Sequence, residues 1–242
     1  MRRPPVPIRL IPALVVLLLA GLPARADFVL NNLRFTLYHE TAHAVIDQLD
    51  VALFGPEEVA ADGFALVLAD RMHDEATMRA LIADVVTLGR ADSAREVFDP
   101  WEDYMIGPQR LAWAVCVYYG LAPDLRADTA RALGMPPARM PRCREAGVRL
   151  RAAWRPVLER LKPGPDHGGS FDVRLVERAG KALRLLRPDL DRLDAMLSLP
   201  RKIPLLSEHC GEDNAFYYHT DERIVFCEEM VDALRVRRRP GR

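Results

Sequence analysis

The chain has 242 residues, of which 50% are hydrophobic and 28% are charged. That length suits one domain or two small ones with a real core, and the composition excludes a wholly disordered or collagen-like chain. Basic and acidic residues both number 34, so the formal net charge is zero and nothing in it indicates nucleic-acid binding.

Residues 1–26 have the pattern of a signal peptide. Three arginines precede or flank an apolar run over Ile11–Leu22, and Ala24-Arg25-Ala26 supplies a small-x-small cleavage pattern. The run is shorter than the ~20 residues that span a bilayer, so we expect no stable membrane span after cleavage, with a retained anchor as the alternative. Cleavage would remove four arginines and no acid, which leaves 30 basic against 34 acidic residues in a periplasmic or secreted protein.

Residues 31–161 are predicted to be helical nearly throughout. Asn31 or Asn32 can cap a first helix that ends near Leu49. Gly55-Pro56 favours the start of a second helix, whose first turn holds the acids Glu57-Glu58. Apolar spacing ends that helix near residue 72 and predicts further helices over 74–88, 108–119 and 139–161.

Lys162–Ser170, with the sequence KPGPDHGGS, is the most linker-like stretch of the chain. Beyond it the spacing predicts a strand over 171–175, a helix over 176–197, a strand over 203–208, a hairpin with strands at 215–218 and 223–226, and a short helix over 228–236. The expected fold class is therefore α+β, mostly helical with a small sheet. Residues 27–161 and 171–242 are expected to form one domain.

His39-Glu40-Thr41-Ala42-His43 is an HExxH motif inside the first predicted helix. Because residues four apart share a helix face, both imidazoles can reach one metal ion. Glu40 would lie beside that ion, where it can hold a water molecule and take its proton. The motif predicts a zinc site with Glu40 as the general base, and two satisfied core histidines are the alternative.

The second predicted helix offers a third ligand. Glu58 and Asp62 form an E-x-x-x-D pattern that starts 15 residues after His43. Glu58 as a ligand would leave the fourth position open to water, the arrangement of a catalytic zinc site. Asp62 can accept a hydrogen bond from a ligand histidine and fix its tautomer. Glu57 is expected to face elsewhere, and the alternative for both glutamates is simple stabilisation of the helix N-terminus.

The four cysteines are widely spaced and form no CxxC motif, which argues against a thioredoxin motif or a zinc ribbon. In an oxidising compartment an even number of them predicts two disulfides, and locality favours sequential pairing among Cys116, Cys143, Cys210 and Cys227. A zinc cluster of the last two cysteines with His209 and His219 is the alternative.

Several segments resemble a family of exported bacterial proteins described as candidate zinc metallopeptidases. LYHETAHAVIDQLDVALFGPEEVAADGFA resembles its HExxH helix and the acidic segment that follows, and PQRLAWAVCVYYG resembles its QR…C…YG helix. Arg142-Cys143-Arg144 resembles its second cysteine segment, and CGEDNAFYYHTDERIVFCEEM resembles its hairpin. The resemblance covers most of residues 33–230. It implies a zincin-like fold with zinc on His39, His43 and an acid of the second helix, and it agrees with the sequential disulfides.

The chain departs from the family pattern in two respects. The strand–helix–strand–hairpin portion precedes the HExxH helix in the family but follows it here, which predicts a circular permutation. Relatives often carry an acidic-His segment before the QR helix, where this chain has Trp101-Glu102-Asp103-Tyr104. The Tyr104 hydroxyl is a candidate stabiliser of a developing oxyanion, with an ordinary buried tyrosine as the alternative.

The motifs and the resemblance together predict an exported zinc-dependent metalloendopeptidase. Zn²⁺ would polarise the peptide carbonyl, and Glu40 would act as general base and then as acid. The expected partner is a peptide or protein substrate, which can pair with a sheet edge beside the cleft. The alternatives are a non-catalytic exported binding or scaffold protein that keeps zinc, and a peptidase whose own segment closes the cleft. Glu40 favours the enzyme, because metal retention alone does not need it.

Overall fold

The computed structural model describes residues 27–95, 97, 99, 101, 105, 107–175 and 180–238. The predicted signal peptide lies outside these residues. Among the described residues, the helical half contains α1 (Phe28–Gln48), α2 (Glu57–Met72), α3 (Glu75–Ser93), α4 (Gly107–Leu121), α5 (Pro123–Ala132), a 3₁₀ turn (Pro137–Arg139) and α6 (Met140–Arg160). The second half contains β1 (Phe171–Val173), α7 (Lys181–Leu185), α8 (Arg187–Met196), β2 (Ile203–Glu208), β3 (Ala215–Tyr218), β4 (Arg223–Cys227) and α9 (Glu229–Arg237).

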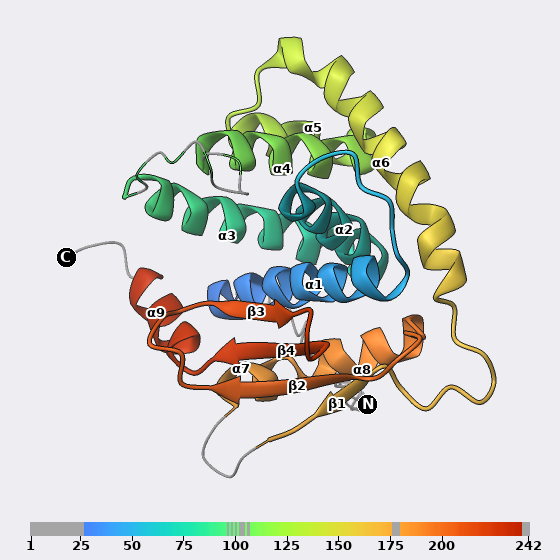
Figure 1. Cartoon of the computed structure of the whole chain (residues 1–242). Helices are drawn as coiled ribbons and strands as arrows, with labels where there is room; N and C mark the ends of the chain where they lie inside the picture. The colour runs from blue at the N-terminus through green and yellow to red at the C-terminus, as the bar shows by residue number, and fades with distance from the viewer. Residues whose placement is uncertain are drawn as a thin grey trace, which may run out of the picture.

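Helix α1 lies between the other helices of the first half and the β-sheet (Figure 1). It packs against α2 and α3 on one side and against β3 and α9 on the other. This position explains why α1 is buried almost all round, from Leu33 and Leu37 to Ala44 and Val45. Because the helix is enclosed, the histidines and the glutamate of its HExxH motif are removed from solvent as well.

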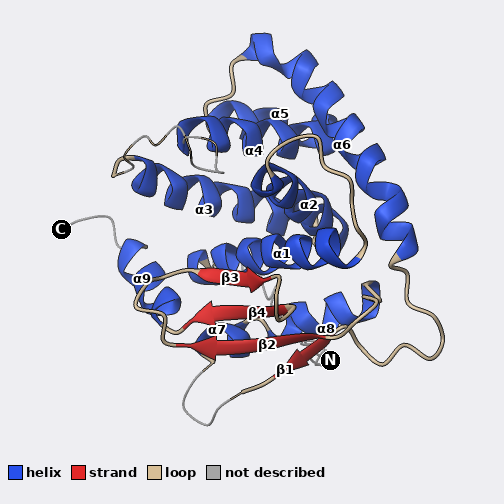
Figure 2. Ribbon diagram, in the orientation of Figure 1, coloured by secondary structure: helices blue, strands red, loops and turns tan. Residues whose placement is uncertain are grey.

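The sheet has four strands in the order β1-β2-β4-β3 (Figure 2). The pairs β1–β2 and β2–β4 are parallel, whereas β3 and β4 form an antiparallel hairpin. Helices α7 and α8 supply the crossover between the parallel strands β1 and β2 and lie behind the sheet in Figure 2. The order leaves β3 as the edge strand that faces α1. The predicted α+β fold, mostly helical with a small sheet and a hairpin, is confirmed.

Both disulfides join the cysteines in the predicted sequential pairs, Cys116–Cys143 and Cys210–Cys227. The first connects α4 to α6, where Gly120 and Gly147 let the two backbones approach so closely that a Cβ at either position would clash with the other helix. The second ties the loop after β2 to the end of β4. Along the described parts of the chain, no helix combines the length and apolar content needed to cross a bilayer.

Several predicted boundaries were wrong. The first helix begins at Phe28, because Asp27 caps it by accepting hydrogen bonds from the amides of Val29 and Leu30. Asn31 and Asn32, the predicted caps, lie inside the helix. The predicted helix over 176–197 is two helices within its described part, and Pro188 in the first turn of α8 lacks the N–H that would continue α7.

Other elements differ in extent. The third helix continues five residues beyond the predicted 88, to Ser93, and β1 is two residues shorter than predicted. Helix α5 was missed, because its segment is polar and buries only Arg126 and Ala130. Residues 162–170 form a loop, as predicted, but Asp194 holds its end by accepting from the amides of Ser170 and Phe171.

Candidate metal centre

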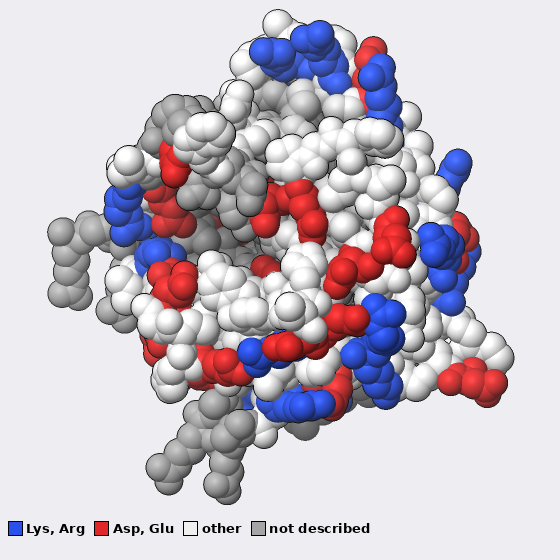
Figure 3. All heavy atoms as spheres, viewed as in Figure 1, with Lys and Arg blue, Asp and Glu red and all other residues white. Residues whose placement is uncertain are grey.

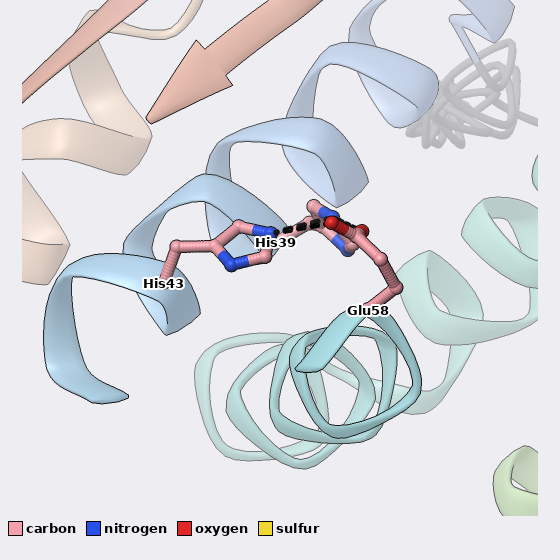
Figure 4. A group of neighbouring side chains, drawn as sticks. All are labelled: His39, His43 and Glu58. Atoms are coloured by element: carbon pink, nitrogen blue, oxygen red, sulfur yellow. Dashed lines mark hydrogen bonds and ion pairs between the residues drawn. The ribbon is translucent and has the colours of Figure 1, made fainter. Parts of the chain in front are cut away.

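The side chains of His39, His43 and Glu58 point toward one another between α1 and α2 (Figure 4). The Nε2 atoms of the two histidines are 3.1 Å apart, and Oε2 of Glu58 lies 3.0 Å from Nε2 of His39. The other carboxylate oxygen of Glu58 lies 3.6 Å from Nε2 of His43. Each of the three residues thus offers one ligand atom within 4.8 Å of the others, which suits a single ion.

Local structure explains this convergence. The HExxH spacing puts both histidines on one face of α1, as the sequence predicted. Residues 49–56 then reverse the chain, so that the first turn of α2 comes alongside that face. Pro56 precedes α2, and Glu57 and Glu58 occupy its first turn, where the helix dipole favours carboxylates.

Asp62 holds the outer ring nitrogen of His39, as the sequence predicted for a ligand histidine. Its Oδ1 lies 2.9 Å from Nδ1 of His39. Arg110 of α4 donates two hydrogen bonds to the same carboxylate, from Nε to Oδ2 at 2.6 Å and from Nη2 to Oδ1 at 2.7 Å. Burial raises the pKa of Asp62, but the bonds from Arg110 and His39 outweigh it and the pKa is lowered. The carboxylate therefore stays charged and keeps the imidazole oriented.

Glu57 plays the corresponding part for His43, and the expectation that it faces elsewhere was wrong. Its Oε1 lies 2.7 Å from Nδ1 of His43. Consecutive helix residues differ by about 100° in direction, so Glu58 reaches between the two histidines while Glu57 reaches the outer side of His43. A helix-wheel argument missed this contact because the contact depends on how closely α1 and α2 approach.

The donor set fits a zinc ion of the catalytic type. With a carboxylate at each Nδ1, the proton of each imidazole is held there when Nε2 acts as a ligand. Two imidazole nitrogens and one carboxylate oxygen are ligands that Zn²⁺ accepts, and three protein ligands leave a fourth position for water or substrate. In the absence of metal, the hydrogen bonds to Asp62 and Glu58 outweigh the effect of burial and raise the pKa of His39 to about 9.

Glu40 lies next to this centre and is only 6% exposed. Burial raises the pKa of its carboxyl group to about 7, against the opposing charges of His39 and His43. The backbone N–H of Tyr217 in β3 also donates to Glu40, which lowers the pKa. A carboxyl group that titrates near neutrality can both accept and return a proton, which is what a general base and acid must do.

The edge of β3 borders the centre. The N–H of Cys227 donates to the carbonyl of Asn214 at 3.0 Å, which sets the alternation of the antiparallel ladder. Alternate residues from Asn214 onward therefore bond to β4, whereas the backbone groups of Ala215 and Tyr217 point to the open edge. This agrees with the bond from the Tyr217 N–H to Glu40. The hairpin thus forms one wall beside the HExxH helix.

A cavity of about 500 Å³ opens on the side of the centre where His39, Glu40 and Asp62 lie. Apolar side chains from α1, α3, α4 and α9 line much of it. In the space-filling view, acidic side chains gather around a hollow in the middle of the face, whereas Lys and Arg lie mostly toward its margins (Figure 3).

His219 was not predicted as part of the site, because its spacing resembles no ligand motif. It lies just beyond β3, and its Nε2 is 3.8 Å from Oε1 of Glu57. With His43 and Glu57 it forms a second group that meets the geometric requirement for a metal. It is 54% exposed in its side chain and belongs to the outer surroundings of the centre. Tyr104, the candidate oxyanion stabiliser, lies outside the described residues.

The cysteines form no zinc cluster with His209 and His219, because all four are used in disulfides. His73 is also accounted for: its Nε2 lies 2.7 Å from the hydroxyl of Tyr38. Of the six histidines in the sequence, only His39, His43 and His219 are in groups that could hold a metal among the described residues.

A family model matches most of the chain, over residues 22–158 and 181–239. The family is DUF4344, and its description is "Putative metallopeptidase". Both matched parts include residues of the site, since the first contains the HExxH helix and the second contains the β3–β4 hairpin. The resemblance deduced from the sequence is thereby confirmed, while the circular permutation stays a prediction. No curated protein and no solved structure matches the chain.

Proposed function

The chain belongs to the DUF4344 family, and on that premise we propose that it is an exported zinc metalloendopeptidase. In this proposal His39, His43 and Glu58 hold the zinc ion and Glu40 is the general base. The observation that carries it is the convergence of two Nε2 atoms and one carboxylate beside a buried glutamate whose pKa is about 7. A family of metallopeptidases implies peptide substrates.

When bound, zinc would supply Lewis-acid chemistry, polarising the scissile carbonyl and lowering the pKa of a coordinated water. Glu57 and Asp62 keep the two imidazoles in the tautomer that leaves Nε2 free for the ion. Arg110 neutralises the buried Asp62 and so prevents it from taking the proton of His39. Each ligand histidine is thus positioned by a carboxylate from α2.

Glu40 moves the protons of the reaction. Its carboxylate accepts a proton from the attacking water as the new C–O bond forms. The same proton then passes to the leaving nitrogen as the C–N bond breaks, which leaves a free amine and a carboxylate as products. Its low exposure supports this role, because burial keeps the pKa close to neutrality.

The open edge of β3 supports a mode of substrate binding. An extended peptide can add to a sheet edge through main-chain hydrogen bonds, which are independent of its sequence. The outward backbone groups of Ala215 and Tyr217 would receive it beside Glu40. In this arrangement Tyr217 N–H exchanges its bond to Glu40 for one to the peptide. Tyr104 remains our proposed oxyanion stabiliser.

Export is part of the proposal. Two disulfides are typical of proteins that mature in an oxidising compartment such as the periplasm. The signal-like pattern of residues 1–26 agrees with this localisation.

A digest of a broad peptide library tests the function. The protein purified with its metal should cleave peptides, lose this activity in a strong chelator, and regain it with about one equivalent of zinc per chain. Metal analysis of the same preparations provides the stoichiometry. Cleavage that persists after the metal has been removed would contradict the proposal.

A further inference from the structure

The cavity beside Glu40 could bind part of a substrate next to the metal centre. We propose that it is a specificity pocket for one large apolar side chain of the substrate, belonging to the residue that carries the leaving nitrogen. The inference rests on the proposed peptidase function and adds the class of substrate to it. It is carried by the composition of the cavity, by its size and by the position of Glu40 in its wall.

Four helices that are distant in sequence supply most of the wall, and Asp62 of α2 and residues of two loops complete it. Phe35 of α1, Val85 and Leu88 of α3, Leu111 and Ala114 of α4 and Leu234 of α9 all contribute apolar surface. Removing apolar surface from water is worth about 25 cal/mol per Å², and an aromatic side chain can bury about 150–250 Å². A pocket lined in this way therefore binds a Phe, Leu or Met side chain more tightly than Gly or Ala, which bury little apolar surface.

Five charged groups of the wall are engaged with one another, whereas Asp99 accepts a hydrogen bond from the amide of Trp101. Arg237 forms ion pairs with Asp92, at 3.7 Å, and with Asp213. Asp62, also in the wall, is bound to Arg110. A charged substrate side chain would lose its own hydration on entering this largely apolar wall, whereas an apolar side chain would not. This favours an apolar over a basic occupant, although acids outnumber bases in the wall.

The size of the cavity agrees with this occupant. A volume of about 500 Å³ lies within the range of roughly 300–1,000 Å³ that small-ligand sites have. It is ample for one large side chain together with part of its backbone. His39 and Glu40 line the cavity, whereas His43 and Glu58 do not, so it opens on one side of the metal centre only.

Proton delivery decides which substrate residue enters. Glu40 returns its proton to the nitrogen of the broken bond, so that nitrogen must lie against Glu40 at the moment of cleavage. The side chain attached next to that nitrogen is then the one that faces the cavity. The residue on the other side of the scissile bond lies away from it.

Binding of small blocked amino acids tests the pocket without any turnover. N-acetyl-L-phenylalaninamide places its acetyl carbonyl where the scissile carbonyl would lie and its ring where the pocket is. Ligand-observed NMR with the zinc-loaded protein should show it binding about 10-fold or more tighter than N-acetylglycinamide and N-acetyl-L-lysinamide, since small apolar differences alone are worth 10- to 200-fold.

Two variants locate the effect. Val85→Phe and Leu88→Phe each add bulk to the cavity wall, and each should reduce binding of the phenylalanine probe about 10-fold. Val148→Phe is the matched control, because Val148 is 61% exposed on α6 and does not line the cavity. It should leave probe binding unchanged. Matched peptides with Phe or Gly after the scissile bond should differ in kcat/KM in the same order.

The outcomes separate the pocket from the peptidase function. Equal binding of the phenylalanine and glycine probes, or tighter binding of the lysine probe, would overturn the pocket, whether or not the cavity variants fold. Selective binding that Val85→Phe or Leu88→Phe abolishes, without cleavage of any peptide, would support the pocket and refute the peptidase. Cleavage with no preference for Phe over Gly would support the peptidase and overturn the pocket.

Discussion

Glu57 contacts the ring of His43 on the side opposite to the proposed metal position, with Oε1 2.7 Å from Nδ1. Glu58 approaches the same ring from its Nε2 side, at 3.6 Å. Two consecutive glutamates thus contact one histidine: Glu58 is a candidate metal ligand, and Glu57 is the group that fixes the tautomer of His43.

This relationship predicts separable effects of the two glutamates on zinc affinity. Glu58→Ala removes a ligand and should abolish tight binding. Glu57→Ala should lower affinity about 10- to 100-fold, the usual effect of losing the hydrogen-bond partner of a ligand histidine. Competition with a zinc-chelating dye measures the zinc affinity of both variants. Glu145→Ala, at an exposed position of α6, is the control. Wild-type affinity in Glu57→Ala would show that the contact has no influence on the metal.

Arg110 should matter for stability as well as for the metal. Its two bonds to Asp62 compensate the burial of that carboxylate. Arg110→Gln removes the charge. We expect the free energy of unfolding to fall by about 1–3 kcal/mol, because the buried carboxylate of Asp62 loses its charged donor. Urea unfolding of the metal-free protein measures this. Arg149→Gln, which removes an exposed ion pair with Glu145, should cost less.

The metal-free protein should lose stability as the pH rises from about 6.5 to about 9. Below pH 6.5 the pKa of His73, which burial lowers to about 4, gives a contribution of the opposite sign to that of Glu40. The pKa of Glu40 is raised from 4.5 to about 7 and that of His39 from 6.5 to about 9. Raised pKa values mean that the folded chain holds protons that the unfolded chain releases. Their stabilisation is therefore complete below the pKa values of the unfolded chain, and it is lost as the pH rises through the pKa values of the folded chain. Urea midpoints measured in chelator across this range give the slope.

A variant isolates the contribution of Glu40. Glu40→Gln does not titrate at residue 40, so its stability relative to wild type should increase as the pH rises from 4.5 to 7, while it keeps the decline toward pH 9. A metal-free protein whose stability rises between pH 6.5 and 9, or a variant whose stability relative to wild type does not change between pH 4.5 and 7, would contradict these assignments. Zinc affinity should increase as the pH rises, because the ion must displace the proton of His39.

The two halves of the chain should unfold as one unit. Contacts between them include the ion pair of Arg34 with Asp189, at 3.0 Å, and the bond from the Tyr217 hydroxyl to Asp47, at 2.6 Å. A protease site inserted within residues 162–170 should therefore give fragments that stay associated after cleavage and melt in a single transition. Two independent transitions in calorimetry would show separate domains.

The centre was largely readable from sequence because its parts are local. HExxH places two imidazoles by helix geometry alone, and the short return to Pro56 brings Glu58 and Asp62 to them. The strand boundaries at 203–208 and the disulfide pairs also followed from local pattern. The longest of these relationships, the Cys116–Cys143 disulfide, spans 27 residues of sequence.

The surroundings of the centre were not readable, because they depend on tertiary packing. The bond from Tyr217 to Glu40 joins residues 177 positions apart in the sequence. The contact of Glu57 depends on the separation of two helices, and the cavity wall needs α3, α4 and α9 to converge on α1. The cap at Asp27 was missed because two asparagines four and five residues later offered the same chemistry.

The most direct test of the account compares zinc-loaded wild type with Glu40→Gln in the peptide-library digest. The substitution keeps the shape of the side chain but removes its ability to accept a proton. The account predicts that both proteins bind about one equivalent of zinc, and that hydrolysis falls by about 10²-fold or more in the variant, the scale of a lost general base. Cleavage by Glu40→Gln at the wild-type rate, with equal zinc content, would contradict the account.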